Sequence, residues 1–334
     1  MRLYILYGFT FAAAFLLALY LTPLMRKAAL QFGIIDKPDG KLKNHHEPVA
    51  YLGGLAIYIS FLVSLALILS FDQEMLGILL AGTIIVVLGL IDDFGVLSPG
   101  VKLCGQSIAV LVLIRSGIYI KLGFIPWYVS FPLSYLWLIG ITNAFNIIDV
   151  MDGLSAGVAF MCSLAIFVVG VLNDSMTIAI MAASLGGCLL GFLRYNFEPA
   201  KIYMGDTGSM FIGMMLGALA MIGNYTTHNL IACISPVLIL GVPIFDTFFV
   251  MYIRYLRGMS IISGSPDHFA LRLRKWRLTT KQTVVASYGI SLLLGCAALF
   301  IMQLAHLQAL VVVSTLITFA LIIGYLLKKV DMTL

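Results

Sequence analysis

Apolar runs of membrane-spanning length recur along the whole chain. A helix that crosses a bilayer needs roughly 20 mostly apolar residues, and about eleven segments meet this condition. They span 3–25, 52–71, 76–92, 102–119, 131–148, 154–172, 177–193, 209–224, 229–251, 284–303 and 308–328. Hydrophobic residues make up 61% of the chain and charged residues only 10%, which excludes an ordinary soluble domain. We predict an all-α, polytopic integral membrane protein, because backbone polar groups in lipid need internal partners.

The basic residues predict the orientation of these helices. Lys and Arg concentrate in short loops on the cytoplasmic side of a membrane. If the loop 26–50 is cytoplasmic, only Arg2, Arg115 and Lys121 of the 20 Lys and Arg residues lie on the other side. We therefore predict an outside N-terminus and a cytoplasmic C-terminus in the inner (cytoplasmic) membrane. The net charge of +5 then reflects topology and contact with the lipid bilayer, and no nucleic-acid partner is expected.

The chain shows no internal repeat or low-complexity tract, so residues 1–334 are predicted to form a single membrane domain. The five cysteines fall in predicted helices without C-x-x-C spacing, and no disulfide is expected. Of the 15 acidic residues, only Asp72, Glu74 and Asp174 are assigned to outside loops. The chemistry is therefore expected at the cytoplasmic face. The predicted active-site loops are 26–51, 92–102, 146–154, 194–208 and 252–283.

The first acidic cluster ends an apolar run. The stretch LGLIDDFG places Asp92 and Asp93 side by side at the end of a predicted span. Adjacent residues on a helix point about 100° apart. One of the two carboxylates can therefore serve the chemistry while the other is structural.

The second cluster is NAFNIIDVMDGLSAG, in which Asn143, Asn146, Asp149 and Asp152 recur every third residue. This spacing predicts one polar stripe along a helix. A stripe facing lipid would leave polar groups unpaired, so it must face a polar cavity or partner helices. Asparagines often join membrane helices, but two aspartates in the same stripe favour a functional site.

The third cluster is RYNFEPAKIYMGDTGSM, in which Asp206 lies between glycines at a predicted helix start. Asn196 and Lys201 precede it. Such a loop offers backbone N–H groups beside a carboxylate, which suits a phosphate together with its divalent cation. The alternative is an ordinary turn with Asp206 as the helix N-cap.

The fourth cluster is the basic loop 252–283, entered from a predicted helix that carries Asp246. Most of its Arg and Lys residues fit cytoplasmic loop charge, but His268 beside Asp267 lies on the side of the acidic clusters. Oxygen ligands without a Cys or His cage favour Mg²⁺, with Mn²⁺ as an alternative. Together with basic and glycine-rich loops, they indicate phosphoryl transfer to a lipid phosphate at headgroup level.

These motifs resemble one family over nearly the whole chain. The family is the polyprenyl-phosphate N-acetylaminosugar-1-phosphate transferases of glycosyltransferase family 4, the bacterial group that includes WecA, TagO and MraY. The resemblance is closest to the WecA/TagO branch. The motifs occur in family order, as GIIDKPDGKLKNHHEPVAYLGGLAIY, GLIDDFGVLSPGVKLCGQ, NAFNIIDVMDGLSAG, NFEPAKIYMGDTGSMFIG, PIFDTFFVMYIRYLRG and SPDHFALRL.

The resemblance implies transfer of an N-acetylaminosugar 1-phosphate, expected to be GlcNAc 1-phosphate, from a UDP-sugar donor to polyprenyl (undecaprenyl) phosphate. UMP is released and a polyprenyl-pyrophosphoryl sugar forms, the first membrane step of a cell-envelope polysaccharide. A single displacement is expected, with a covalent aspartyl intermediate as the alternative. The sequence is compatible with a homodimer.

The resemblance also implies roles for individual residues. The predicted metal ligands are Asp206 and Asp93. The predicted catalytic residues are Asp92, Asp93, Lys102, Asp149 and His268. The predicted substrate-binding residues are Asn143, Asn146, Asp152, Asn196, Lys201, Arg272, Lys41 and His45.

The chain departs from the family pattern in the basic loop. The family motif His-x-His-His-Arg-Leu is replaced by HFALRL, which keeps His268 and Arg272 but has Ala270 and Leu271 in place of two histidines. MraY-type transfer of phospho-MurNAc-pentapeptide is an alternative that this loss disfavours. An ion-coupled transporter is a second alternative, although its acids would lie near the bilayer midplane within repeated halves. An intramembrane aspartyl protease is disfavoured because YMGDTG lacks the Gly-x-Gly-Asp pattern.

Overall fold

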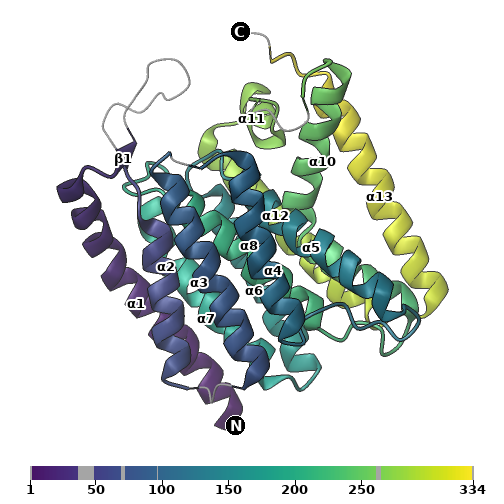
Figure 1. Ribbon diagram of the computed structural model, residues 1–334. Coiled ribbons are helices and arrows are strands. Elements are labelled where there is room, and N and C mark those ends of the chain that lie inside the picture. The colour runs from purple at the N-terminus through teal and green to yellow at the C-terminus, as the bar shows by residue number, and fades with distance from the viewer. Residues whose placement is uncertain (1, 37–48, 69–71, 96, 261–264, 333–334) are drawn as a thin grey trace.

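The computed structural model describes residues 2–36, 49–68, 72–95, 97–260 and 265–332 (Figure 1). Strands β1 (Ile35–Asp36) and β2 (Val49–Ala50) form a short antiparallel pair. The longer elements of the described residues are helices, as predicted. The helices are α1 (Arg2–Phe32), α2 (Gly53–Ala66), α3 (Gln73–Asp93), α4 (Pro99–Arg115), α5 (Trp127–Ile147), α6 (Leu154–Leu172), α7 (Met176–Asn196), α8 (Gly205–Ile222), η1 (Leu230–Ile234), α9 (Ser235–Ile239), α10 (Gly241–Leu256), α11 (Phe269–Lys275), α12 (Thr280–Ile301) and α13 (His306–Lys328).

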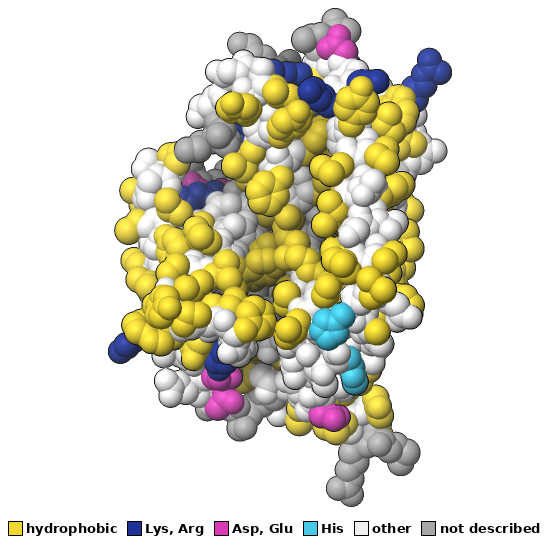
Figure 2. Space-filling model, turned by 90° about the vertical axis from the view of Figure 1, so that its right-hand side faces the viewer, with side chains coloured by type: hydrophobic (Ala, Val, Ile, Leu, Met, Phe, Trp, Pro, Cys, Tyr) yellow, Lys and Arg dark blue, Asp and Glu magenta, His cyan; other side chains and the backbone are white. Residues whose placement is uncertain are grey.

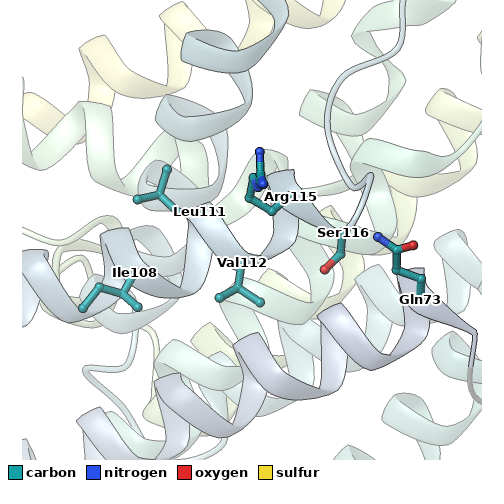
Figure 3. Close-up of a pocket in the computed structure, with 6 residues that line it drawn as sticks. All are labelled: Gln73, Ile108, Leu111, Val112, Arg115 and Ser116. Atoms are coloured by element: carbon teal, nitrogen blue, oxygen red, sulfur yellow. The ribbon is translucent and has the colours of Figure 1, made fainter.

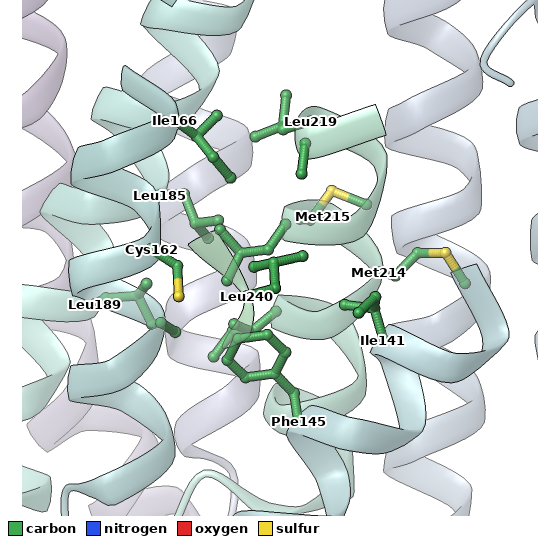
Figure 4. Close-up of a cluster of buried hydrophobic side chains, with 14 of the residues drawn as sticks. Ile141, Phe145, Cys162, Ile166, Leu185, Leu189, Met214, Met215, Leu219 and Leu240 are labelled. Atoms are coloured by element: carbon green, nitrogen blue, oxygen red, sulfur yellow. The ribbon is translucent and has the colours of Figure 1, made fainter. Parts of the chain in front are cut away.

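Helix α8 forms the centre of the bundle. Along an 18-residue stretch of α8, 89% of the residues are buried, whereas the corresponding fraction is 11% for α13 at the edge. Helices α3 and α5 pack along α8, and α2 and α6 also contact it. Figure 4 shows where α5, α6 and α7 meet α8. The apolar residues labelled there are Ile141, Phe145, Cys162, Ile166, Leu185, Leu189, Met214, Met215, Leu219 and Leu240. This packing fixes the position of both ends of α8.

Each predicted apolar segment overlaps one or more helices of the described residues, but the number of spans remains a prediction. Among the described residues, seven helices are long and apolar enough to cross a membrane, and one bent pair would make an eighth. Helix α2 has only 14 residues. The prediction of a multi-pass, all-α membrane protein is nevertheless confirmed in its class.

The prediction of one continuous span over 229–251 is wrong. This segment is broken at Leu240, where the axes of the preceding helical stretch and of α10 differ by 76°. Gly241 and Pro243 open α10. Proline has no N–H to continue the hydrogen-bond ladder and glycine is a weak helix former, so a helix start is favoured there. Helix α10 is thereby directed toward α13 and α11 (Figure 1).

The surface has the polarity of a membrane protein. Figure 2 shows a band of hydrophobic side chains across the middle of one face, with most charged side chains above and below it. The start of α1 and the end of α13 lie at opposite ends of the bundle (Figure 1). The hydrophobic band supports insertion of the bundle into lipid.

Candidate functional site

Helix ends converge where the sequence predicted a site. Asp92 lies at the end of α3, Lys102 in the first turn of α4, Asn146 at the end of α5 and Asp206 at the start of α8. Packing of α3 and α5 against α8, and of α4 against α3, brings these ends together. The starts of α4 and α8 direct the positive ends of their helix dipoles to this point. The site therefore combines carboxylates with features that attract anions.

The ammonium of Lys102 contacts each of the other three side chains. Its Nζ lies 2.8 Å from Asp92 Oδ2 and 2.5 Å from Asp206 Oδ2. It also donates to Asn146 Oδ1 at 3.2 Å. The Nδ2 group of Asn146 in turn donates to Asp206 Oδ1 at 2.7 Å. We call Asp92, Lys102, Asn146 and Asp206 the Lys102 cluster.

Asp206 is the most open member of the charged set. Its side chain is 36% exposed, compared with 18% for Lys102 and 13% for Asp92. Asp206 therefore has more solvent-accessible side-chain surface than Asp92.

Asp93 has a different role from its neighbour. Its Oδ1 accepts the backbone N–H of Asp206 at 2.6 Å, and its Oδ2 accepts the Thr207 hydroxyl at 2.6 Å and the Thr207 N–H at 3.2 Å. Asp93 therefore caps α8 from another helix, satisfying N–H groups that lack intrahelical partners. Gly205 allows this approach, since it has φ +69° and a Cβ there would lie 2.6 Å from Asp93 Oδ2.

This arrangement gives Asp93 structural contacts, and its predicted role as a metal ligand and catalytic group stays a prediction. Both of its carboxylate oxygens accept hydrogen bonds from the N-terminus of α8. Asp93 thereby fixes the start of α8, and with it the position of Asp206. Of the adjacent pair, Asp92 is the carboxylate that contacts Lys102.

Only the first half of the predicted polar stripe lies on a helix. Helix α5 ends at Ile147, so Asn143 and Asn146 lie on the helix while Asp149 and Asp152 lie in the following turn. Asn143 exchanges hydrogen bonds with the Gln106 amide at 2.9 and 3.3 Å. Asn143 thus joins α5 to α4, as asparagines commonly do between membrane helices, and its predicted substrate contact stays a prediction.

Asp149 lies in the turn 148–153, close to other carboxylates. Burial, together with the charges of Asp206, Asp93 and Asp152, raises the pKa of Asp149 to about 8. Each of these effects disfavours another negative charge. A cation beside Asp206 would act in the opposite direction and favour the ionised form of Asp149.

Residues of the loop before α8 have mainly structural contacts. Asn196 is only 4% exposed; it accepts the Gly153 N–H and donates to the carbonyl of Ile202. Asp152 accepts the Ala200 N–H at 2.8 Å. Lys201 has an exposed side chain. The predicted substrate contacts of these three residues remain predictions, while Lys41 and His45 lie outside the described residues.

His268 belongs to a second network, between α10, α11 and α13. Its Nδ1 lies 2.7 Å from Asp246 Oδ2, and the adjacent Phe269 N–H donates to Asp246 Oδ1 at 2.8 Å. His268 is 6% exposed. Asp246 therefore fixes both the ring and the backbone at the start of α11.

Arg272 also has contacts within the protein. It is 1% exposed, and its Nη2 donates to Asp267 Oδ1 at 2.6 Å. Its Nη1 donates to the carbonyls of Leu327 at 3.0 Å and Val330 at 2.7 Å. The guanidinium thus closes the end of α13, whose last carbonyls lack helical partners. Its predicted substrate contact stays a prediction.

A cavity of about 440 Å³ lies away from the Lys102 cluster. It is lined by Gln73 at the start of α3 and by Ile108, Leu111, Val112, Arg115 and Ser116 of α4 and its end (Figure 3). Asp92 is at the other end of α3, about 30 Å away by helix rise. This cavity therefore has no part in the acidic site.

Sequence reasoning missed several residues that position the site. Thr207 follows Asp206 within the motif, and its role as a partner of Asp93 could have been suspected from that adjacency. Gln106 and Tyr288 gave no comparable signal. Their bonds to Asn143 and to the Gly153 carbonyl join segments far apart in sequence.

Comparisons with known proteins identify a family and several relatives that this chain resembles. A family model described as glycosyl transferase family 4 matches residues 75–224, which include the whole Lys102 cluster but not His268. A Bacillus subtilis protein named probable undecaprenyl-phosphate N-acetylglucosaminyl 1-phosphate transferase is 33% identical over 94% of this chain and 90% of its own. A Mycolicibacterium smegmatis protein named decaprenyl-phosphate N-acetylglucosaminephosphotransferase is 32% identical over 82% of this chain and 77% of its own. A Heliobacterium modesticaldum protein named phospho-N-acetylmuramoyl-pentapeptide-transferase is 31% identical over 85% of this chain and 94% of its own.

Proposed function

The chain belongs to glycosyl transferase family 4, and on that premise we propose that it transfers N-acetylglucosamine 1-phosphate from a UDP-sugar to polyprenyl phosphate. UMP and a polyprenyl-pyrophosphoryl sugar are the products. The observation that carries the proposal is the Lys102 cluster, which lies inside the matched region and joins an ammonium to the carboxylates of Asp92 and Asp206. The hydrophobic band and the position of this cluster at helix ends support a reaction at the cytoplasmic surface of the inner membrane.

The reaction exchanges one phosphorus–oxygen bond for another. An oxygen of the polyprenyl phosphate forms a bond to the phosphorus that carries the sugar. The bond from this phosphorus to the bridging oxygen breaks, and the electron pair leaves with UMP. In such transfers, protein groups act mainly by positioning and by stabilising negative charge.

Lys102 is placed to bind the reacting phosphates. Asp92 and Asp206 hold its ammonium from two sides, and the starts of α4 and α8 favour negative charge at the same point. A phosphate monoester has a second pKa of about 6, so the acceptor is mostly a dianion at pH 7. Asp92 is then needed to orient Lys102 and to accept a residual proton, not to act as a strong base.

The donor set fits a hard divalent cation such as Mg²⁺. Within the described ranges, no three carboxylate, histidine or cysteine side chains are grouped closely enough to form a complete metal site. Mg²⁺ is commonly held by one or two carboxylates together with water and substrate phosphates. Asp206, the more exposed acid of the cluster, would hold the cation, with the side-chain amide oxygen of Asn146 nearby. When bound, the cation would neutralise charge on the donor diphosphate.

Divalent cations are therefore expected to be essential for turnover. Incubation with EDTA should abolish UMP release, and added Mg²⁺ or Mn²⁺ should restore it, because Lys102 alone leaves most of the diphosphate charge unbalanced. A coupled assay of UMP release measures both steps. Undiminished activity in EDTA would contradict the assignment of Asp206 to a metal.

A donor screen tests the proposed reaction itself. The purified protein is incubated with UDP-N-acetylglucosamine, other UDP-sugars or UDP-MurNAc-pentapeptide, each with and without polyprenyl phosphate. We expect UMP release with UDP-N-acetylglucosamine, only in the presence of the lipid. Turnover of the pentapeptide donor alone would establish the alternative reaction that the Heliobacterium relative's name describes. UMP release without lipid would refute a transferase of this class.

A further inference from the structure

The turn between α5 and α6 is held by side chains from distant segments. The Gly153 N–H donates to Asn196 Oδ1 at 3.1 Å, at the end of α7. The Gly153 carbonyl accepts the hydroxyl of Tyr288 at 2.6 Å, from α12. Both backbone polar groups of one residue are thus bonded to side chains of two different helices. These bonds fix the turn that carries Asp149 and Asp152.

Two glycines leave room for the ring of Tyr288. A Cβ added at Gly157 would lie 2.0 Å from Tyr288 Cζ, so only glycine leaves room for the ring against α6. Gly153 has φ +77°, and a Cβ there would lie 3.2 Å from the Tyr288 hydroxyl oxygen. Gly153 is the N-cap of α6, and its carbonyl also accepts the Gly157 N–H at 3.0 Å. The tyrosine hydroxyl supplies a partner from outside the local chain.

The turn and the Lys102 cluster belong to one site. Helix α5 enters the turn with Asn146, which bonds to Asp206 and Lys102. Asp152 accepts the Ala200 N–H, which ties the turn to the segment leading into α8 and Asp206. A displacement of Gly153 would therefore move Asp149 and Asp152 relative to Asp206. Small displacements of this kind reduce productive binding in transfer reactions.

We propose that Tyr288 is a positioning residue for the donor half of the site: its hydroxyl holds the Gly153 carbonyl so that the turn 148–153 presents Asp149 and Asp152 toward the start of α8. This inference rests on the proposed function for its kinetic consequence. Helix α12 follows directly on α11, which begins after His268. Tyr288 thus couples the segment that carries His268 to the acidic turn.

Tyr288→Phe removes the hydroxyl and keeps the ring against Gly157. A single hydrogen bond contributes about 0.5–1.5 kcal/mol net, so we expect the KM for the UDP-sugar to rise about three- to tenfold, and the KM for polyprenyl phosphate to stay within twofold. The matched control is Tyr58→Phe, which removes a 2.6 Å bond between the Tyr58 and Thr83 hydroxyls of α2 and α3. It should leave both KM values unchanged.

Hydrogen–deuterium exchange provides a second measurement that needs no substrate. Peptides covering 148–157 should exchange faster in Tyr288→Phe than in the wild type or in Tyr58→Phe. If the wild type is inactive with every UDP-sugar but these peptides respond, the proposed function fails and the positioning role stands. If the wild type is active and the variant shows a lower Tm with unchanged exchange and unchanged donor KM, Tyr288 only supports the fold and the inference fails. A rise in the lipid KM alone would also overturn it.

Discussion

Asp206→Asn is expected to reduce turnover about 100- to 1,000-fold, the range found when a group that stabilises transition-state charge is removed. The substitution keeps the size of the side chain but removes the negative charge of the more exposed acid of the Lys102 cluster. It would weaken cation binding and leave the Lys102 ammonium paired with Asp92 alone. Initial rates of UMP release at saturating donor and lipid measure the loss.

The comparison variant is Asp246→Asn. Asp246 is buried and contacts His268 and Phe269 in the second network, so its substitution should change turnover much less than that of Asp206. Asp72→Asn is a neutral control, because Asp72 caps α3 at the far end of the bundle and asparagine caps helices equally well. Comparable losses in Asp206→Asn and Asp246→Asn, at matched Tm, would count against the metal assignment.

The sequence was sufficient to predict that one set of polar residues would meet. Apolar runs fix which residues lie at helix ends, and the basic residues indicate which ends share a side of the membrane. Asp92, Lys102, Asn146 and Asp206 are each at such an end, and the structure brings them into direct contact. Their motifs also lie in a region matched by the family model.

The division of labour between Asp92 and Asp93 could not be predicted in this way. Adjacent residues on a helix point in different directions, but the sequence does not say what lies in each direction. Asp93 meets the N-terminus of α8, more than 100 residues further along the chain. The sequence therefore left open which of the two acids is structural, and the contacts of Asp93 with the start of α8 favour Asp93.

The same reason explains why the structural contacts of Asn143 and Arg272 could not be predicted. In the sequence, a polar residue at helical spacing looks the same whether its side chain faces the substrate or a neighbouring helix. Asn143 finds its partner in Gln106 of α4, and Arg272 finds carbonyls at the end of α13, 55 to 58 residues away. Tyr288 is the opposite case, since it resembles an ordinary residue of an apolar helix but bonds the acidic turn.

Removal of the Arg272 side chain is expected to act on stability. The resemblance of the HFALRL motif places Arg272 among the predicted substrate-binding residues. The structure instead places the guanidinium between the Asp267 carboxylate and the carbonyls of Leu327 and Val330. Arg272→Ala would leave Asp267, which is fully buried, with the partly exposed Arg257 and the nearby charge of Arg254.

Removing one partner of a buried ion pair reduces the free energy of unfolding by about 3–5 kcal/mol, which corresponds to a fall in Tm of about 5 °C for a chain of this length. Arg272→Lys should fall between the wild type and Arg272→Ala, because an ammonium can pair with Asp267 but cannot also reach both carbonyls in a planar fork. Thermal unfolding in one detergent measures the three proteins. Arg274→Ala, an exposed position of the same helix, is the control and should shift Tm by less than about 1 °C.

A double-mutant cycle separates this role from contact with substrate. Asp267→Asn removes the buried charge that Arg272→Ala would strand, so the double variant should lose clearly less stability than the sum of the two single losses. The donor KM should remain close to the wild-type value in all variants that stay folded. If Tm is unchanged in Arg272→Lys while the donor KM rises several-fold, the guanidinium binds the donor diphosphate. The closure of α13 by Arg272 would then be a minor contact, and the role inferred from the motif would be supported.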